Sequence, residues 1–176
     1  MSLPRRLIIE PTTRCNLRCQ MCLREVLQEP FSDMSPETYR RLLPLFPYLE
    51  SVNLTGYGEP LLNTGLLEMV RLATGRLPPG AKLTFTTNGS LISPDLALEI
   101  VKSGLDELGV SVEGCSAQTH DGIRQGSDFQ QVLEATATTA AVRRRLGRHK
   151  PRLVIHFVAM KRNLRELPSL VGLARE

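Results

Sequence analysis

The chain has 176 residues, of which 41% are hydrophobic and 23% are charged, so it is long enough for one domain with a sizeable core. No apolar run has the length of a membrane span, and the apolar stretch near the amino terminus is too short for a secretory signal. We therefore expect residues 1–176 to form one cytoplasmic domain with no membrane partner. The net charge of +4 is mild, and the dense basic run at residues 143–152 has no aromatic side chains for base stacking, which disfavours a nucleic-acid partner.

Short β-rich runs alternate with helical patterns along the chain. Strands are predicted at residues 7–9, 51–55, 83–87, 107–112 and 153–158. Helices are predicted at residues 35–43, 64–73, 94–104, 127–146 and 163–175. This alternation predicts the α/β class, as a partial, open (βα) barrel of parallel strands that resembles a TIM barrel and has about five to six βα units.

The helix boundaries carry recognisable residues. Ser35 and Ser93 are each followed by proline, so each serine is a candidate N-cap with proline at the first helical position. The last predicted helix carries apolar residues on one face, namely Leu164, Leu167, Leu170, Val171 and Ala174.

The last strand raises a question about completeness. Five βα units do not close a barrel that usually has eight, so residues 153–158 would present an unpaired apolar edge. We expect either that the chain is a truncated part of a longer enzyme or that a partner completes the sheet. Self-association through this edge is one form of the second alternative.

Three cysteines, Cys15, Cys19 and Cys22, lie close together in the spacing C-x3-C-x2-C. Three thiolates on one loop can hold three irons of a [4Fe–4S] cluster and leave the fourth iron open to another ligand. Their clustering favours metal binding over a disulfide framework, which spreads its bridges along the chain. A zinc site completed by Cys115 or a histidine is the alternative.

Polar and glycine-rich segments follow the predicted strands, at the sheet edge where α/β proteins place their chemistry. Residues 56–60 read Gly-Tyr-Gly-Glu-Pro, in which glycine permits positive φ and a close approach to a ligand, and Glu59 offers a carboxylate to an ammonium group. Ser111 and Glu113 alternate with apolar residues, so they point to the same face of their strand.

The cysteine triplet and several later motifs together resemble the radical S-adenosylmethionine (radical SAM) superfamily. The motifs are residues 10–16, 56–60, 86–89 and 123–129, and they look most like the branch with molybdenum-cofactor, PQQ and peptide-modifying (SPASM/twitch) members. The resemblance implies a [4Fe–4S] cluster on the three cysteines. It also implies contacts to S-adenosylmethionine (SAM): Met21 near the adenine, Gly56, Gly58, Glu59 and Pro60 at the amino group, Ser111 and Glu113 near the ribose, and Arg124 at the carboxylate. Asn88 would line the same interior, or Asn88-Gly89 would form only a tight turn.

The resemblance implies reductive cleavage of SAM to a 5′-deoxyadenosyl radical that abstracts hydrogen from a substrate, such as a peptide or a cofactor precursor. A small flavodoxin-like or ferredoxin-like protein would supply the electron. No catalytic residue is assigned. Two alternatives remain: a non-catalytic iron–sulfur electron-transfer protein and a zinc-binding structural module. The branch carries auxiliary clusters on a cysteine-rich extension, and no cysteine follows Cys115 here.

Two further residues have open roles. His156 lies in the last predicted strand, where a satisfied core histidine is favoured over one that faces a substrate. Asn163 is interpreted as a helix N-cap at least as readily as a SAM contact.

Overall fold

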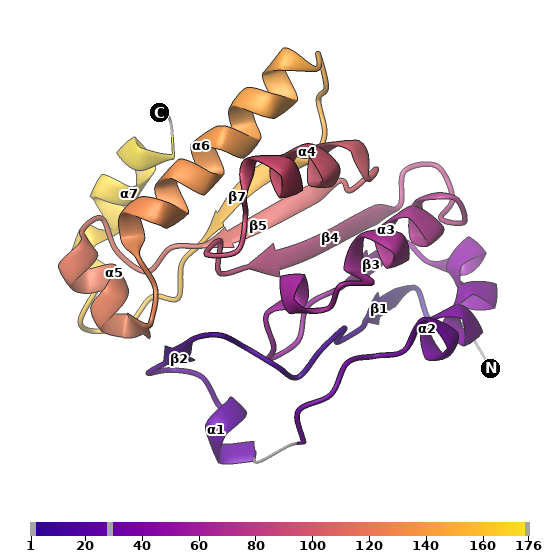
Figure 1. The fold of residues 1–176 in the computed structure, drawn as a ribbon, viewed down its shortest axis with the longest axis horizontal. Coiled ribbons are helices and arrows are strands. Elements are labelled where there is room, and N and C mark those ends of the chain that lie inside the picture. Colours follow the sequence, from indigo (N-terminus) through magenta and orange to yellow (C-terminus); the bar gives the residue numbers. More distant parts are fainter. Residues whose placement is uncertain (1–2, 28–29, 175–176) are drawn as a thin grey trace.

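The structure is a computed structural model that describes residues 3–27 and 30–174. Five parallel strands form its main sheet in the order β1-β3-β4-β5-β7 (Figure 1). The strands are β1 (Arg6–Ile8), β3 (Ser51–Asn53), β4 (Lys82–Thr87), β5 (Glu107–Ser111) and β7 (Arg152–His156). All five predicted strands and their parallel pairing are confirmed, with boundaries that differ by a few residues.

The longer helices also match the prediction. They are α2 (Pro36–Leu42), α3 (Leu66–Thr74), α4 (Pro94–Lys102) and α6 (Phe129–Arg145). The Ser35 and Ser93 hydroxyls accept hydrogen bonds from the backbone of Thr38 and Leu96, which confirms both N-caps. Between these elements lie two 3-10 turns, η1 (Leu43–Tyr48) and η2 (Pro60–Leu62).

The last predicted helix differs from expectation. It consists of a 3-10 turn, η3 (Leu164–Glu166), and a helix, α7 (Leu167–Leu173), while Arg175 lies outside the described residues. Of its apolar face only Leu170 is buried, because Leu164, Leu167 and Val171 are at least 40% exposed. This short helix therefore contacts the core through Leu170 and the partly buried Leu173.

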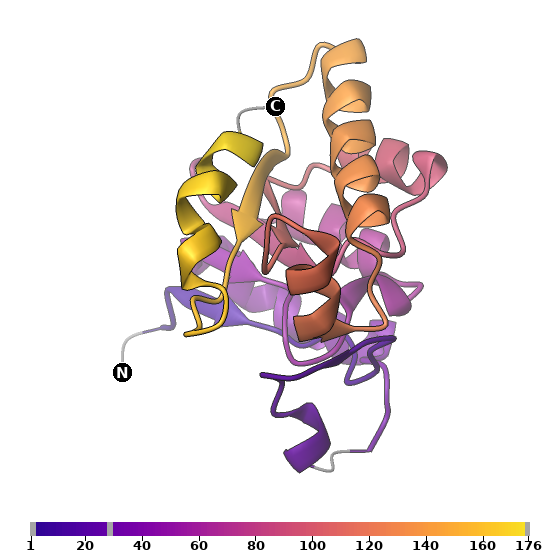
Figure 2. The same cartoon turned by 90° about the vertical axis from the view of Figure 1, so that its left-hand side faces the viewer.

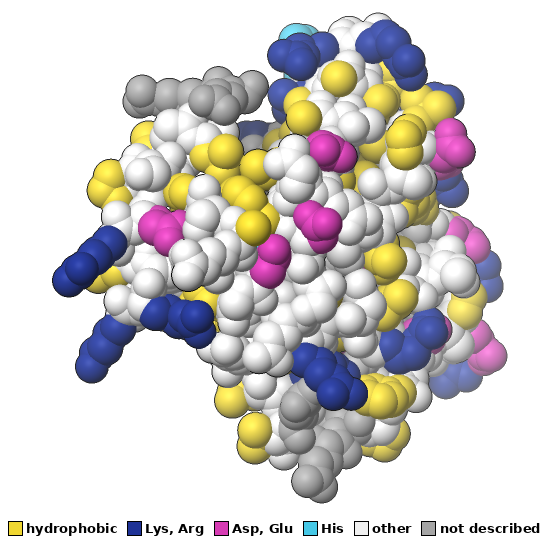
Figure 3. All heavy atoms as spheres, turned by 60° about the vertical axis from the view of Figure 1, so that its left-hand side comes forward, with side chains coloured by type: hydrophobic (Ala, Val, Ile, Leu, Met, Phe, Trp, Pro, Cys, Tyr) yellow, Lys and Arg dark blue, Asp and Glu magenta, His cyan; other side chains and the backbone are white. Residues whose placement is uncertain are grey.

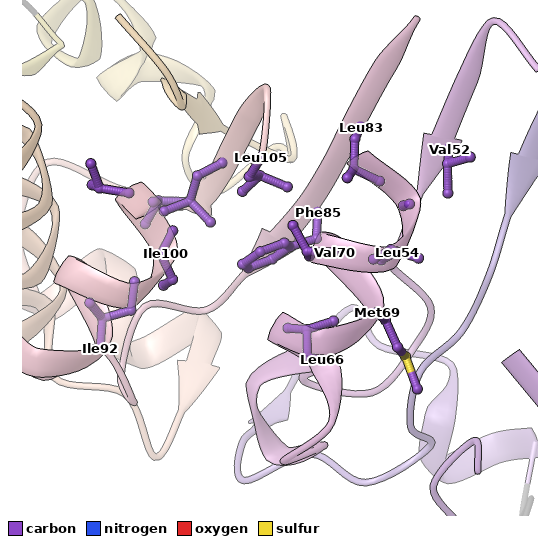
Figure 4. Close-up of a cluster of buried hydrophobic side chains, with 14 of the residues drawn as sticks. Val52, Leu54, Leu66, Met69, Val70, Leu83, Phe85, Ile92, Ile100 and Leu105 are labelled. Carbon is purple, nitrogen blue, oxygen red and sulfur yellow. The ribbon is translucent and has the colours of Figure 1, made fainter. Parts of the chain in front are cut away.

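Helices α3, α4 and α6 lie on one side of the sheet (Figures 1 and 2). Alternate strand residues point to that side and form the core, among them Val52, Leu54, Leu83 and Phe85, which Figure 4 shows between the strands and α3. The opposite face is open: Ile8 of β1 is 73% exposed. A curved parallel sheet with helices outside and an open inner face is the predicted partial barrel.

Four short elements were not predicted. They are two helices, α1 (Arg24–Leu27) and α5 (Ala117–Ile123), and a separate antiparallel pair, β2 (Arg18–Cys19) and β6 (Arg124–Gln125). Figure 1 shows α1 and β2 away from the main sheet, after the cysteine loop has left β1.

The described surface carries both signs of charge. On the face shown in Figure 3, acidic side chains lie between the basic ones, so this face has no continuous basic stripe. Among the described residues, no helix has the length and apolarity to cross a membrane.

Candidate iron–sulfur and SAM site

The cysteine loop leaves the carboxyl end of β1 and is fixed at its base. Thr12 and Arg14 both donate to the Asp33 carboxylate, at 2.6 Å from the Thr12 hydroxyl and 2.6 Å from Arg14 Nη2. Asn63 Nδ2 donates to the Pro11 carbonyl at 2.7 Å. These contacts hold the residues immediately before Cys15 to the loop that precedes α2 and to the end of η2.

Donor groups approach two of the three half-buried thiols. The Leu17 backbone N–H lies 3.5 Å from Cys15 Sγ, and Arg124 Nη1 lies 3.8 Å from Cys19 Sγ. Burial raises the pKa of both thiols, while the Arg124 charge lowers the pKa of Cys19. Donors directed at sulfur suit thiolate ligands, so these residues fit an iron–sulfur cluster. Among the described residues, no three His, Cys, Asp or Glu side chains converge tightly enough for a single metal ion.

The glycine-rich turn after β3 packs directly on the cysteine loop. The Glu59 N–H donates to the Arg14 carbonyl at 2.7 Å. A Cβ on Gly58 would lie 1.9 Å from the Thr12 carbonyl oxygen, and one on Gly56 would lie 2.2 Å from Glu10 Oε1. Neither glycine has a positive φ, so that part of the prediction was wrong. Close approach to the cysteine loop and to Glu10 explains both glycines.

The Glu59 side chain is 2% exposed, and both of its oxygens are occupied. It accepts from the Thr87 hydroxyl at 2.6 Å, from the Asn88 N–H at 2.7 Å and from the Leu61 N–H at 3.2 Å. Burial raises its pKa, and these three donors oppose that effect. The carboxylate therefore joins the turn to the end of β4, and a ligand ammonium would be a further partner. Pro60 follows as the buried first residue of η2.

Asn88 connects the end of β4 with the cysteine loop. Its Nδ2 donates to Asn16 Oδ1 at 2.9 Å, and its Oδ1 accepts from the Ser90 hydroxyl at 2.7 Å. Asn88 is 4% exposed, so its side chain is engaged within the protein.

Glu113 and Arg124 form a buried ion pair near the cysteines. Arg124 Nη2 and Nε donate to Glu113 Oε1 at 2.9 and 3.2 Å, and the Arg124 and Glu113 side chains are 12% and 0% exposed. Glu113 Oε2 accepts from the Val158 N–H at 2.7 Å. Because Arg124 also faces Cys19 across the β2–β6 pair, it joins the cysteine loop to the carboxyl end of β5.

Ser111 ends β5 and is 7% exposed, and no hydrogen bond to its hydroxyl occurs among the residues that the structure describes. Met21 is half-buried within the cysteine loop. The structure thus brings the predicted residues to one edge of the sheet, while their contacts with SAM remain predictions.

Three further residues contribute to this edge in ways that were not predicted from the sequence. Glu10 accepts from the Tyr57 and Gly58 N–H groups. His120 is fully buried and accepts from the Glu113 N–H at 3.1 Å. Asn163, interpreted above as an N-cap at least as readily as a SAM contact, makes no capping bond and instead donates to the carbonyls of Glu113 and Val158, both at 3.0 Å. The contacts of Glu10 and the contact between Asn163 and Glu113 join residues far apart in sequence. Of these three residues, only Glu10 belongs to a segment that the sequence motifs singled out, residues 10–16.

A family model described as the radical SAM superfamily matches residues 9–155 of the chain. The chain therefore belongs to this superfamily, whose enzymes use a [4Fe–4S] cluster and SAM. The prediction of the family, of an enzyme and of this cofactor pair is confirmed at that level.

Individual relatives refine the comparison. The chain is similar to the tungsten-containing aldehyde ferredoxin oxidoreductase cofactor-modifying protein of Pyrococcus furiosus, with 29% identity over 93% of this chain and 46% of the relative. It is 30% identical to the GTP 3′,8-cyclase of Chlorobaculum tepidum over 96% of this chain and 49% of that protein. The chain thus spans about half the length of these curated relatives.

A solved structure agrees on the fold. Streptococcus suis SuiB bound to S-adenosylmethionine has a TM-score of 0.77 and 20% identity, over 98% of this chain and 38% of that one. The same protein has been solved with its precursor peptide SuiA. This likeness confirms the α/β partial-barrel architecture.

Proposed function

We propose that the chain is the cluster-binding and SAM-binding part of a radical SAM enzyme, with Cys15, Cys19 and Cys22 as cluster ligands. The observation that carries this proposal is the convergence on one cysteine loop of the glycine-rich turn, the end of β4 and Arg124. Glu59 N–H reaches Arg14, Asn88 reaches Asn16, and Arg124 reaches Cys19. An electron carrier needs a cluster but has no need of these additional elements.

Different residues of the site are proposed to bind different groups of SAM. Arg124 uses Nε and Nη2 for Glu113, and a guanidinium has further N–H groups that suit the SAM carboxylate. The turn at residues 56–60 is held rigidly by Glu10 and Glu59, so its backbone can bind the SAM amino group. Ser111 and Glu113 are proposed near the ribose, Asn88 beside them, and Met21 at the adenine.

When bound, the cluster and SAM would supply one-electron cleavage and a radical that abstracts hydrogen from the substrate. The chain's own residues position these groups and shield them from water. We propose a peptide or a cofactor precursor as substrate, because the relatives include a cofactor-modifying protein and a neighbour solved with a precursor peptide. A flavodoxin-like or ferredoxin-like protein is proposed as the electron donor.

Anaerobic reconstitution tests the proposal. The chain is incubated with iron and sulfide, and iron, sulfide and zinc contents are measured. Dithionite and SAM are then added, and methionine and 5′-deoxyadenosine are quantified. We expect a brown protein that produces both compounds. A brown protein that never cleaves SAM would support the electron-transfer alternative, and a colourless zinc-loaded protein would support the structural one.

A further inference from the structure

The open face of the sheet carries a histidine that the proposed cofactor site does not use. His156 ends β7, is exposed, and points away from the helices because its neighbour Ile155 packs against the core. The expectation of a satisfied core histidine is therefore wrong. β7 pairs with β5 in a register that places His156 beside Ser111, at the carboxyl ends of both strands.

Because Gly109 of β5 has no side chain, the His156 ring can reach across that strand. A Cβ on Gly109 would lie 2.9 Å from His156 Cε1, 3.0 Å from Nε2 and 2.8 Å from the Thr86 hydroxyl. The imidazole thus occupies the space above Gly109, and its Nδ1 lies 3.2 Å from Thr86 Oγ1 on β4. Three neighbouring strands fix the ring, which leaves Nε2 over the open face without a hydrogen bond among the described residues.

The basic side chains of this face lie at the amino ends of the strands, at the end opposite His156. Strand alternation and register place Arg6, Lys82 and Arg152 on the open face, and Glu107 beside them pairs with Arg152 at 2.5 Å. An acidic oxygen bound at His156 would therefore depend on the N–H of the ring itself and not on these charges. When the Thr86 hydroxyl donates to Nδ1, the neutral ring carries its proton on Nε2, and a protonated ring also donates there.

We propose that His156, held over Gly109 by Thr86, binds a carboxylate or phosphate oxygen of the substrate. This inference rests on the proposed function, because it interprets the open face as the substrate side of a radical SAM enzyme. His156 lies one strand from Ser111, so it would hold the bound group close to the SAM site.

The test uses the imidazole signals of the chain without cluster or SAM. Sodium acetate and sodium phosphate are titrated separately, with tetramethylammonium chloride as an ionic-strength control. We expect a saturable shift of the His156 ring signals and an Nε2–H tautomer. His149 is the matched reference, because it is exposed within the basic run and reports non-specific anion binding. Saturation by both anions supports a general oxyanion site, and saturation by one alone identifies its class.

Two variants at Thr86 make the test specific. Thr86→Val removes the hydroxyl and should weaken anion binding about tenfold, whereas Thr86→Ser should preserve it. Equal shifts at His156 and His149, equal shifts with the chloride control, or unchanged affinity in Thr86→Val would each overturn the proposal. Because no cluster is present, failure here leaves the SAM proposal standing, and failed reconstitution leaves this result interpretable.

Discussion

Cys19 has the most specific surroundings of the three clustered thiols, since it pairs with Arg124 through the backbone and also receives its guanidinium. Cys19→Ala should abolish cluster binding and SAM cleavage together, because only two thiolates would remain on the loop. Iron content after anaerobic reconstitution measures cluster binding, and formation of 5′-deoxyadenosine measures SAM cleavage. Cys115→Ala is the matched control, because Cys115 lies outside the loop, and it should keep both. Loss of metal in Cys115→Ala would instead favour the zinc alternative.

Glu59 has a more structural role than its sequence motif indicates. Glu59→Gln would place an amide N–H₂ among three existing donors, the Thr87 hydroxyl and the Asn88 and Leu61 N–H groups. We expect the free energy of unfolding to fall by about 1–3 kcal/mol, because at least one buried donor loses its acceptor. SAM affinity should fall as well, because the turn at residues 56–60 is no longer fixed.

Urea denaturation and calorimetric SAM titration measure the two effects. Glu134→Gln changes an exposed glutamate on α6 and should alter neither quantity. If Glu59→Gln weakened SAM binding at unchanged stability, Glu59 would act mainly on the ligand. If neither quantity changed, both roles would be excluded.

At the scale of elements, the β2–β6 pair is the link between the cysteine loop and the rest of the site. Gly126 follows β6 with φ +92°, a conformation that costs an L-residue about 1–2 kcal/mol. Gly126→Ala should therefore destabilise the protein and also lower its cluster content, because it disturbs the strand that carries Arg124.

Gly80→Ala provides the matched control, since Gly80 has φ +87° in an open turn, where an added Cβ would meet no atom within 4 Å. It should show a similar loss of stability with normal iron loading. Thermal denaturation and iron analysis of both variants separate the backbone cost from the effect on the site. Equal iron content in the two variants would mean that β6 does not support the cluster.

The elements also show how far sequence patterns carry. The positions of the strands, their parallel pairing and the longer helices follow from periodicity and caps. Helix α2 ends at Leu42, and a 3-10 turn that contains Pro44 and Pro47 continues from it. The elements β2 and β6 have only two residues each, so no periodicity exists to detect them. The site residues lie together at the carboxyl edge of the sheet, where α/β proteins place their chemistry. The partners of Glu59 and the Glu113–Arg124 pair depend on contacts between distant segments and were not predictable.

At the scale of the whole molecule, several ionisable groups are buried near the carboxyl edge of the sheet, namely Glu59, Glu113 and His120. Burying such groups is costly unless partners compensate. Glu113 has Arg124 and Glu59 has three donors, whereas His120 is held neutral between the Glu113 N–H and the Ser127 hydroxyl, at 3.1 Å each. The free energy of unfolding of the protein should therefore depend on pH.

Burial, with the nearby Arg124 charge, lowers the pKa of His120 to about 4, from about 6.5 in an unfolded chain. Between these values the unfolded state binds a proton that the folded state does not, so stability falls as the pH decreases through this window. Glu59, whose pKa burial raises, opposes the trend, because the folded carboxyl is protonated first. We expect wild type to lose about 1–2 kcal/mol more than His120→Gln between about pH 7 and about pH 5 in urea denaturation. His149→Gln, at an exposed position, should behave like wild type, and an identical pH dependence in His120→Gln would show that His120 does not control acid stability.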